Sequence, residues 1–260
     1  MRLPLLLVCL ALDGAFTPAA LQTIPRHPLE SAPRPTVAVL SFDNNTGDAE
    51  YDHLGRGMAT MMTTDLASVD DIQMLERERL ADVTKEIDAQ HSSYFDSTTA
   101  VKVGRLAGAQ FIVTGAFAAV KPQIRIDTRV IRVETGAIVK TAKVTGKEDD
   151  FFALQQKLAR QLVKDLDIAL SPEGEAKLDA RQQSNRVDDL DAVVGMSNAI
   201  ALSDAGDYAG ALTKMAPVVA RYPNSVVVKV TYDEMKRRAT NSTKQKAKSR
   251  LNGLIKKKWP

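Results

Sequence analysis

The stretch TVAVLSFDNNTGDAEYDHLGRGM, residues 36–58, decides the fold of this chain. Its first seven residues, Thr36–Phe42, are mainly apolar, which is typical of a buried strand. Beyond the polar part, apolar residues recur at helical spacing: Leu54, Met58, Met61, Met62 and Leu66. The hexapeptide DNNTGD, residues 43–48, therefore connects a strand to a helix.

This hexapeptide admits three interpretations: a calcium loop, a phosphate-binding loop or a turn. A calcium loop needs a bidentate acid at its twelfth position, but the twelfth residue counted from Asp43 is Leu54. A phosphate loop needs several glycines and a lysine at the helix start, and this segment has only Gly47 and no lysine. Asp and Asn side chains bond to their own backbone and glycine tolerates a positive φ, so we predict a turn with no metal and no cofactor.

Downstream, strand and helix patterns alternate and predict one mixed sheet faced by helices, the α/β (α+β) class. A long helix, Asp149–Leu170, closes this domain, and a small all-α unit follows it. Before that helix, the sequence predicts a strand at Ile72–Leu75 and then a helix with Leu80, Val83 and Ile87 on one face. A second helix is capped by Ser97, Thr98 or Thr99, carries Val101, Val103 and Leu106, and ends at Gly108. Three strands follow within residues 110–146.

The first two of these three strands are joined only by Lys121 and Pro122, which predicts a tight hairpin. In the second strand, alternation predicts two faces. The inward residues are Ile124, Ile126, Thr128 and Val130, and the outward residues are Arg125, Asp127, Arg129 and Ile131.

Four ordered segments carry a family resemblance: VAVLSFDNNTGDAEYDHLGRGMATMMTTDL, LERERLADVTKEI, VGRLAGAQFIVTGAF and VIRVETGAIV. Together they resemble the CsgG family of curli secretion proteins and the related amino-terminal domain of TolB. The resemblance covers residues 36–170. The residues that match the family pattern are Phe42, Asp43, Asn44 and Gly47 in the first strand and turn, and Glu76, Arg77, Leu80, Gly108 and Gly115 further on.

The resemblance implies an envelope protein without chemistry, which is either a secretion channel or an accessory module that docks to partners. The connection at Lys121-Pro122 and the short polar loop in the 90s supply no hairpin long enough to cross a bilayer. We therefore carry over the soluble domain and predict an assembly or docking module. An oligomeric outer-membrane secretion channel subunit stays open as an alternative.

A hydrolase is the other alternative. His27, His53 and His91 are the only histidines, and none belongs to a metal-binding or nucleophile-elbow motif. Ser92 and Ser93 follow His91, so a hydrolase would need these residues to meet a carboxylate in a pocket. We predict that the protein is not an enzyme.

The first 20 residues have the pattern of a cleaved signal peptide, with Arg2, a short apolar run and small residues at the end. The only cysteine is Cys9, and Val8 before it disfavours lipidation. Residues 21–35 form a proline-rich linker. The sequence thus predicts a periplasmic or secreted protein.

After a polar linker with some helix, residues 171–188, the segment 189–240 becomes rich in alanine and resembles one tetratricopeptide repeat. A single repeat cannot bury its apolar face alone, so it is expected to pack on the next helix, the first domain or a partner. The repeat signature consists of Ala199, Gly206, Tyr208, Ala211 and Pro223.

The final segment, residues 241–260, is a basic tail. From Met235 to Pro260 there are ten Lys or Arg residues and no acid, and since the whole chain has a net charge of +3, residues 1–234 sum to −7 (3 minus 10). Such a tail contacts an anionic membrane, with Trp259 at the interface, or another acidic surface, or is merely solvated. We expect envelope proteins as partners, leave a homo-oligomer open, and expect no nucleic acid because the chain is exported.

Overall fold

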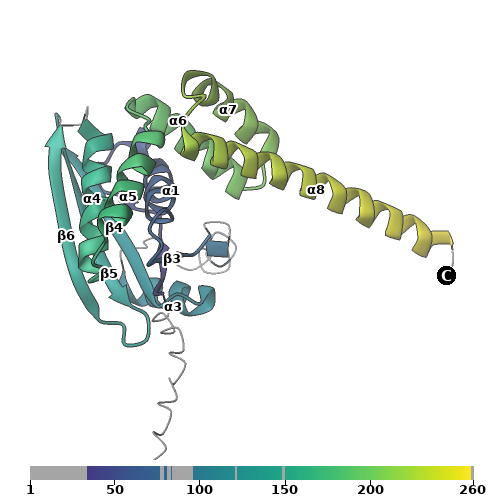
Figure 1. Ribbon diagram of the computed structural model, residues 1–260. Coiled ribbons are helices and arrows are strands. Elements are labelled where there is room, and N and C mark those ends of the chain that lie inside the picture. The colour runs from purple at the N-terminus through teal and green to yellow at the C-terminus, as the bar shows by residue number, and fades with distance from the viewer. Residues whose placement is uncertain are drawn as a thin grey trace, which may run out of the picture. The chain divides into compact units, whose positions relative to one another are not determined.

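The computed structural model describes residues 34–76, 79–80, 83, 96–120, 122–147 and 150–258 (Figure 1). Residues 34–260 form one compact unit. The predicted signal peptide, most of the predicted linker at 21–35, Arg77, His91, Ser92 and Ser93 lie outside the described residues.

A six-stranded mixed sheet forms the centre of the α/β domain, which confirms the predicted α+β class. The strand order is β3-β1-β4-β5-β6, with β2 pairing with β4; β1 runs parallel to β3 and β4, and β4, β5 and β6 are antiparallel. Val120 pairs with Gln123, so the tight hairpin at Lys121-Pro122 is confirmed. The strands are β1 (Thr36–Val39), β2 (Asp43–Asn44), β3 (Gln73–Met74), β4 (Phe111–Val120), β5 (Gln123–Arg132) and β6 (Ile138–Lys147).

Helices cover both faces of this sheet. One face packs alternate residues such as Val37, Val113 and Ile126 into a core with α1 and α4. The other face packs Ala38, Ile112 and their neighbours against α3. The helices are α1 (Leu54–Leu66), α3 (Ser97–Ala107), α4 (Phe151–Asp165), α5 (Pro172–Ser184), α6 (Leu190–Asp204), α7 (Tyr208–Arg221) and α8 (Val226–Lys258), with a 3-10 turn η1 at Ala49–Tyr51.

The predicted strand Thr36–Phe42 is wrong in its extent. β1 ends at Val39, and a second short strand, β2, begins at Asp43. The break occurs because the Phe42 N–H donates to the carbonyl of Gly55 at the start of α1, at 3.4 Å, rather than to a neighbouring strand. The first two residues of DNNTGD therefore belong to the sheet.

Two details around α3 also differ from the prediction. The helix cap is Asp96, whose carboxylate accepts from the Thr99 N–H at 2.9 Å, because Asp96 is the last extended residue before the helix. Ile131 lies on the predicted outer face of β5 but is fully buried there, because α3 covers that end of the face. The predicted helix end at Gly108 is confirmed by its φ of 77°.

The predicted linker at residues 171–188 is mostly helix α5. Ser171 caps it by accepting from the Gly174 N–H at 3.1 Å, and the helix buries only Leu178 and Gln182. The predicted long helix Asp149–Leu170 is shorter, since α4 ends at Asp165.

The helices α6, α7 and α8, here called the helical unit, pack on each other and on α1. The expected contacts of a lone helical hairpin with its next helix and with the first domain are thus both present. The predicted boundary at residue 240 is wrong, because α8 continues through it as one helix of 33 residues. Assignment of this unit to the tetratricopeptide class stays a prediction.

Candidate functional site

Asn44 organises the turn that follows β2. Its side-chain amide donates to the Asp48 carbonyl and to the Asp52 carboxylate, both at 2.8 Å, and its amide oxygen accepts from the Thr46 N–H and hydroxyl. Gly47 takes a φ of 76°. The turn interpretation of DNNTGD is confirmed by these hydrogen bonds, which also hold Asp48 and Asp52 in place.

Phe42 and Gly115, two of the family-pattern residues, form one packing contact. Phe42 is 2% exposed, and a Cβ added at Gly115 would collide with its ring. Only glycine in the middle of β4 leaves room for this ring. Asp43 pairs with Ala116 next to it. These residues therefore anchor the start of the turn rather than line a cavity.

The second set of family-pattern residues is spread over the domain. Leu80 is buried with α3, Gly108 ends α3, and Glu76 is exposed beside a groove between α1 and α8. The structure does not bring them together with the turn. They are structural positions in this fold rather than members of one site.

The repeat-signature residues build the α6–α7 hairpin. Ala199 and Ala211 are fully buried where α6 and α7 meet. Gly206 has a φ of 87° between the helices, Tyr208 is the first residue of α7, and Pro223 follows its end. The cap of α7 is Asp207, which accepts from the Gly210 N–H at 2.9 Å.

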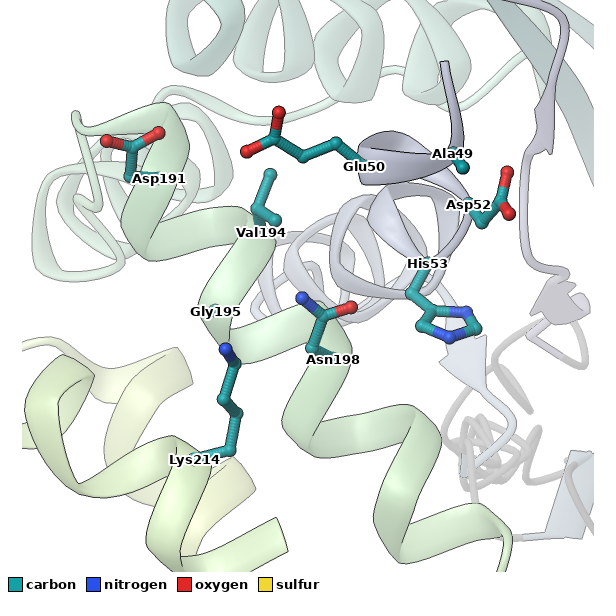
Figure 2. A pocket seen from close by; sticks show the side chains of 9 residues that line it. All are labelled: Ala49, Glu50, Asp52, His53, Asp191, Val194, Gly195, Asn198 and Lys214. Atoms are coloured by element: carbon teal, nitrogen blue, oxygen red, sulfur yellow. The ribbon is translucent and has the colours of Figure 1, made fainter. Parts of the chain in front are cut away.

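A polar hollow of about 470 Å³ lies where the turn meets the helical unit (Figure 2). One wall comes from η1 and the start of α1, and the other from α6 and α7. Its lining residues are Ala49, Glu50, Asp52, His53, Asp191, Val194, Gly195, Asn198 and Lys214. Three carboxylates, an imidazole, an amide and an ammonium group thus converge from segments about 140 residues apart in sequence. We take this hollow as the candidate site.

Small residues allow these two walls to approach. A Cβ added at Gly57 in α1 would collide with the hydroxyl of Ser197 in α6. Ser197 is fully buried and donates to the Val193 carbonyl at 2.7 Å. The close contact of α1 with α6 places Asn198, the next residue, at the hollow.

His53 is the only histidine in the hollow. Burial lowers its pKa from 6.5, Arg56 acts in the same direction, and Asp52 opposes them. The imidazole is therefore neutral at pH 7 and can accept or donate a hydrogen bond. Among the described residues, no group of three or more His, Cys, Asp or Glu side chains is arranged to hold a metal ion.

Asp204, at the end of α6, joins three helices close to the hollow. Its carboxylate pairs with Arg56 of α1 at 3.2 Å and with Arg238 of α8 at 2.9 Å. The side chains of Asp204 and Arg238 are only 10% and 12% exposed. Removal of one partner from such a pair leaves a poorly solvated charge, so this cluster fixes α8 against α1 and α6.

Asp65 holds a second polar cluster under the helical unit. It is 1% exposed and accepts from the Asn185 amide at 2.6 Å and the Gln155 amide at 3.1 Å. Asn185 in turn accepts from the Val227 N–H at the start of α8, at 3.1 Å. Burial raises the pKa of Asp65, opposed mainly by its bonds to Asn185 and Gln155.

The sequence predicted the turn but missed the hollow, because its other wall comes from α6 and α7. Two acidic runs were visible in the sequence, at residues 48–52 and 188–191. Nothing in the sequence alone shows that they face the same space.

A comparison with known families agrees with the architecture. Residues 20–121 match the family model described as "Curli production assembly/transport component CsgG". Residues 20–121 of this chain are thus similar to the CsgG family. The resemblance stated from the sequence is therefore confirmed, and the turn, β4 and the Phe42–Gly115 contact all fall within the matched range.

Three solved structures are similar to this chain over part of its length. The LpoB C-terminal domain from Salmonella enterica is 18% identical, covers 44% of this chain and 84% of its own, and has a TM-score of 0.35. The PelC dodecamer from Paraburkholderia phytofirmans is 15% identical, covers 53% and 89%, and scores 0.34. TolB from Acinetobacter baumannii is 10% identical, covers 51% and 28%, and scores 0.34.

One curated relative is named "Putative adenylate cyclase 3", from Rhizobium meliloti (strain 1021). It is 26% identical over 149 residues, which are 57% of this chain and 24% of that protein. The match thus spans about a quarter of the relative's length. Among the helices described, none is both long and apolar enough to cross a membrane.

Proposed function

We propose that this protein is an exported, non-enzymatic docking module of the cell envelope, and that the hollow between the CsgG-like turn and the helical unit is its contact surface. The family description supports the setting, since it names a component of curli production, assembly and transport. The signal-peptide pattern of residues 1–20 supports export.

The observation that carries the proposal is the construction of the hollow. Its charged and amide side chains come from both the CsgG-like domain and the helical unit. The Asp65 and Asp204 clusters fix these two parts against each other with buried hydrogen bonds and ion pairs. A preformed polar surface of this kind favours recognition, because little conformational entropy is lost when a partner binds.

The lining residues favour binding over catalysis. The hollow offers carboxylates, a neutral imidazole, an amide and an ammonium group, and none of the described residues that line it is a Ser, Thr or Cys nucleophile. The name of the adenylate cyclase relative is not carried over, since the match spans only 24% of that protein.

Export is tested by following the full chain in cells. We expect the protein in the periplasmic or extracellular fraction, with an amino terminus near Leu21, because small residues end the apolar run at that point. Amino-terminal sequencing of the fractionated protein decides this. Full-length protein in the cytoplasm would contradict the proposal, and a terminus at Cys9 would replace the free form with a lipidated one.

Docking is tested by charge changes in the hollow. The double variant Glu50→Lys/Asp191→Lys changes the charge of the whole lining from −2 (three acids and Lys214) to +2, whereas Glu134→Lys/Glu175→Lys makes the same substitutions at exposed sites away from it. We expect only the first variant to lose its crosslinked complexes in intact envelopes. Equal crosslinking by both variants would show that the hollow is not the contact surface.

A further inference from the structure

The second half of α8 is a cationic helix that forms no ion pair with the described residues of its own chain. Residues 241–258, here called the basic arm, carry seven Lys or Arg residues and no acid, and extend over about 27 Å. From residue 241 to residue 250, every side chain is exposed except the half-buried Ser242. Figure 1 shows this yellow end of α8 running beyond α6 and α7.

The charge of the arm is not neutralised locally. Three of the four earlier bases of α8 are paired: Lys236 contacts Asp233, Arg237 contacts Glu234 and Arg238 contacts Asp204. No ion pair of the described part of the chain involves the arm. A helix with this many unpaired like charges is stabilised by an acidic partner.

The spacing of the bases gives two cationic rows. Lys244 and Lys248 are one helical turn apart, and so are Lys246 and Arg250, on roughly the opposite side. The only apolar residue between 241 and 250 is Ala247, so this part has no apolar stripe. A helix that lies in a membrane interface needs such a stripe, and a flat bilayer would meet only one row.

The hollow offers the complementary charge. Glu50 and Asp52 stand on one wall and Asp191 on the other (Figure 2). Within the described part of the chain, none of these three carboxylates forms an ion pair. Lys214 is the one positively charged side chain among the described lining residues, because His53 is neutral at pH 7. The net charges of the two parts of the chain are also opposite in sign: +10 for residues 235–260 and −7 for residues 1–234.

The arm cannot fill the hollow of its own chain. α8 is one uninterrupted helix, and its first turns are fixed on α6 and α7 through Val227, Val228 and Met235, which are at most 2% exposed. A continuous helix does not fold back within its length. The contact must therefore form between chains.

We propose that the basic arm of one copy docks into the acidic hollow of a second copy, with one cationic row between Glu50 and Asp191. This inference rests on the proposed docking role of the hollow and names its partner. The contact joins two different surfaces, so each bound copy still presents one free arm and one free hollow. Such heterologous contacts produce a closed ring or an open chain, depending on the rotation between copies.

The test uses the purified mature chain and measures its mass by sedimentation at 50 mM and 500 mM salt. The wild-type protein is expected to assemble at low salt and to dissociate at high salt, because exposed charges are screened within about 10 Å at 0.1 M salt and less above it. An arm variant replaces Lys244, Lys246, Lys248 and Arg250 by Glu, and a hollow variant carries Glu50→Lys and Asp191→Lys. Each alone is expected to raise the dissociation constant at least about tenfold.

Mixing the two variants provides the decisive measurement. The negative arm then meets the positive hollow, and the positive arm meets the negative hollow, so assembly should return only in the mixture. The Glu134→Lys/Glu175→Lys control should assemble like the wild type. Unchanged circular dichroism of each variant excludes misfolding as the cause.

Three outcomes would overturn the inference: a monomeric wild type at low salt, a hollow variant that assembles normally, or no assembly in the mixture. Binding to vesicles with anionic lipid tests whether the arm contacts a membrane instead of a second copy. If the protein is monomeric and the arm binds vesicles equally well in the hollow variant, the arm is a membrane-binding segment. A cytoplasmic location would contradict the proposed function but leave self-assembly intact. Crosslinks from the hollow to a different envelope protein would support the proposed function but contradict self-assembly.

Discussion

Asp65 offers the sharpest test of how the helical unit is held on the CsgG-like domain. Asp65→Ala would leave two buried amides, those of Gln155 and Asn185, without their acceptor. Each unpaired buried donor costs about 1–3 kcal/mol. Because the ionised carboxylate carries a desolvation penalty that its raised pKa reveals, part of this loss is recovered, and we expect a net loss of about 2–4 kcal/mol at pH 7.

Asp65→Asn should cost less than Asp65→Ala. The Asn oxygen can still accept from Asn185, and the Gln155 amide can turn its oxygen toward the new NH₂ group, since that oxygen has no hydrogen-bond partner among the described residues. For a unit of this size, the Ala variant corresponds to a melting point lower by roughly 5–15 °C. Thermal unfolding followed by circular dichroism measures both variants.

The difference in stability between the wild type and Asp65→Asn is expected to depend on pH. The pKa of Asp65 is raised in the folded state, whereas in the unfolded state it is near the ordinary 3.8. The protonated carboxyl of Asp65 therefore stabilises the folded state fully below pH 3.8. This stabilisation is lost as the pH rises through the raised folded pKa. The stability advantage of the wild type over Asp65→Asn should therefore shrink as pH rises from 4 to 7. Asp179→Asn, at an exposed ion pair, is the matched control for the same carboxylate-to-amide change without burial.

Two results would refute this reasoning about Asp65. One is an unchanged melting point in Asp65→Ala, and the other is an equal loss in the Ala and Asn variants.

The remaining predictions concern the turn and the helix contacts. Gly115→Ala should lower the free energy of unfolding by about 1–3 kcal/mol, because its Cβ collides with the Phe42 ring. Gly47→Ala has open space but a φ of 76°, so it should lower the free energy of unfolding by about 1–2 kcal/mol from backbone strain alone. An unchanged melting point in Gly115→Ala would contradict the packing of Phe42 on Gly115. Asp204→Ala should cost about 3 kcal/mol and speed hydrogen exchange at the start of α8, because Arg238 loses its carboxylate; unchanged protection there would argue against the cluster. Calcium or phosphate should leave the melting point unchanged, whereas a site filled at a hundred times its dissociation constant would add about 2.7 kcal/mol, and a rise that Asp43→Ala abolishes would show a missed ion site in the turn.

Alternation made the sheet predictable from sequence. Ile124, Ile126 and Val130 alternate with polar residues because β5 has two faces, and Lys121-Pro122 leaves room only for a hairpin. Ile131 keeps this alternation but is buried, because α3 covers just one end of the outer face, and that depends on where a distant helix packs. Period alone cannot carry that information.

Elements with little apolar surface were harder to predict. α5 buries only Leu178 and Gln182, so its helix follows from the Ser171 cap rather than from periodicity. α8 changes from apolar to basic along its length, and this shift in composition was mistaken for a boundary near residue 240. The hollow escaped prediction because residues 49–53 and Asp191 meet only through the contact of α1 with α6.

The most direct test of the docking account is a photocrosslinking amino acid at Asn198, on the α6 wall of the hollow, in the protein expressed in its native envelope. A matched probe at Asp179, exposed on α5, serves as the control. The account predicts an adduct from position 198 alone, whose peptide map contains residues 244–250 of a second copy. Equal adducts from both positions, or none from position 198, would contradict it.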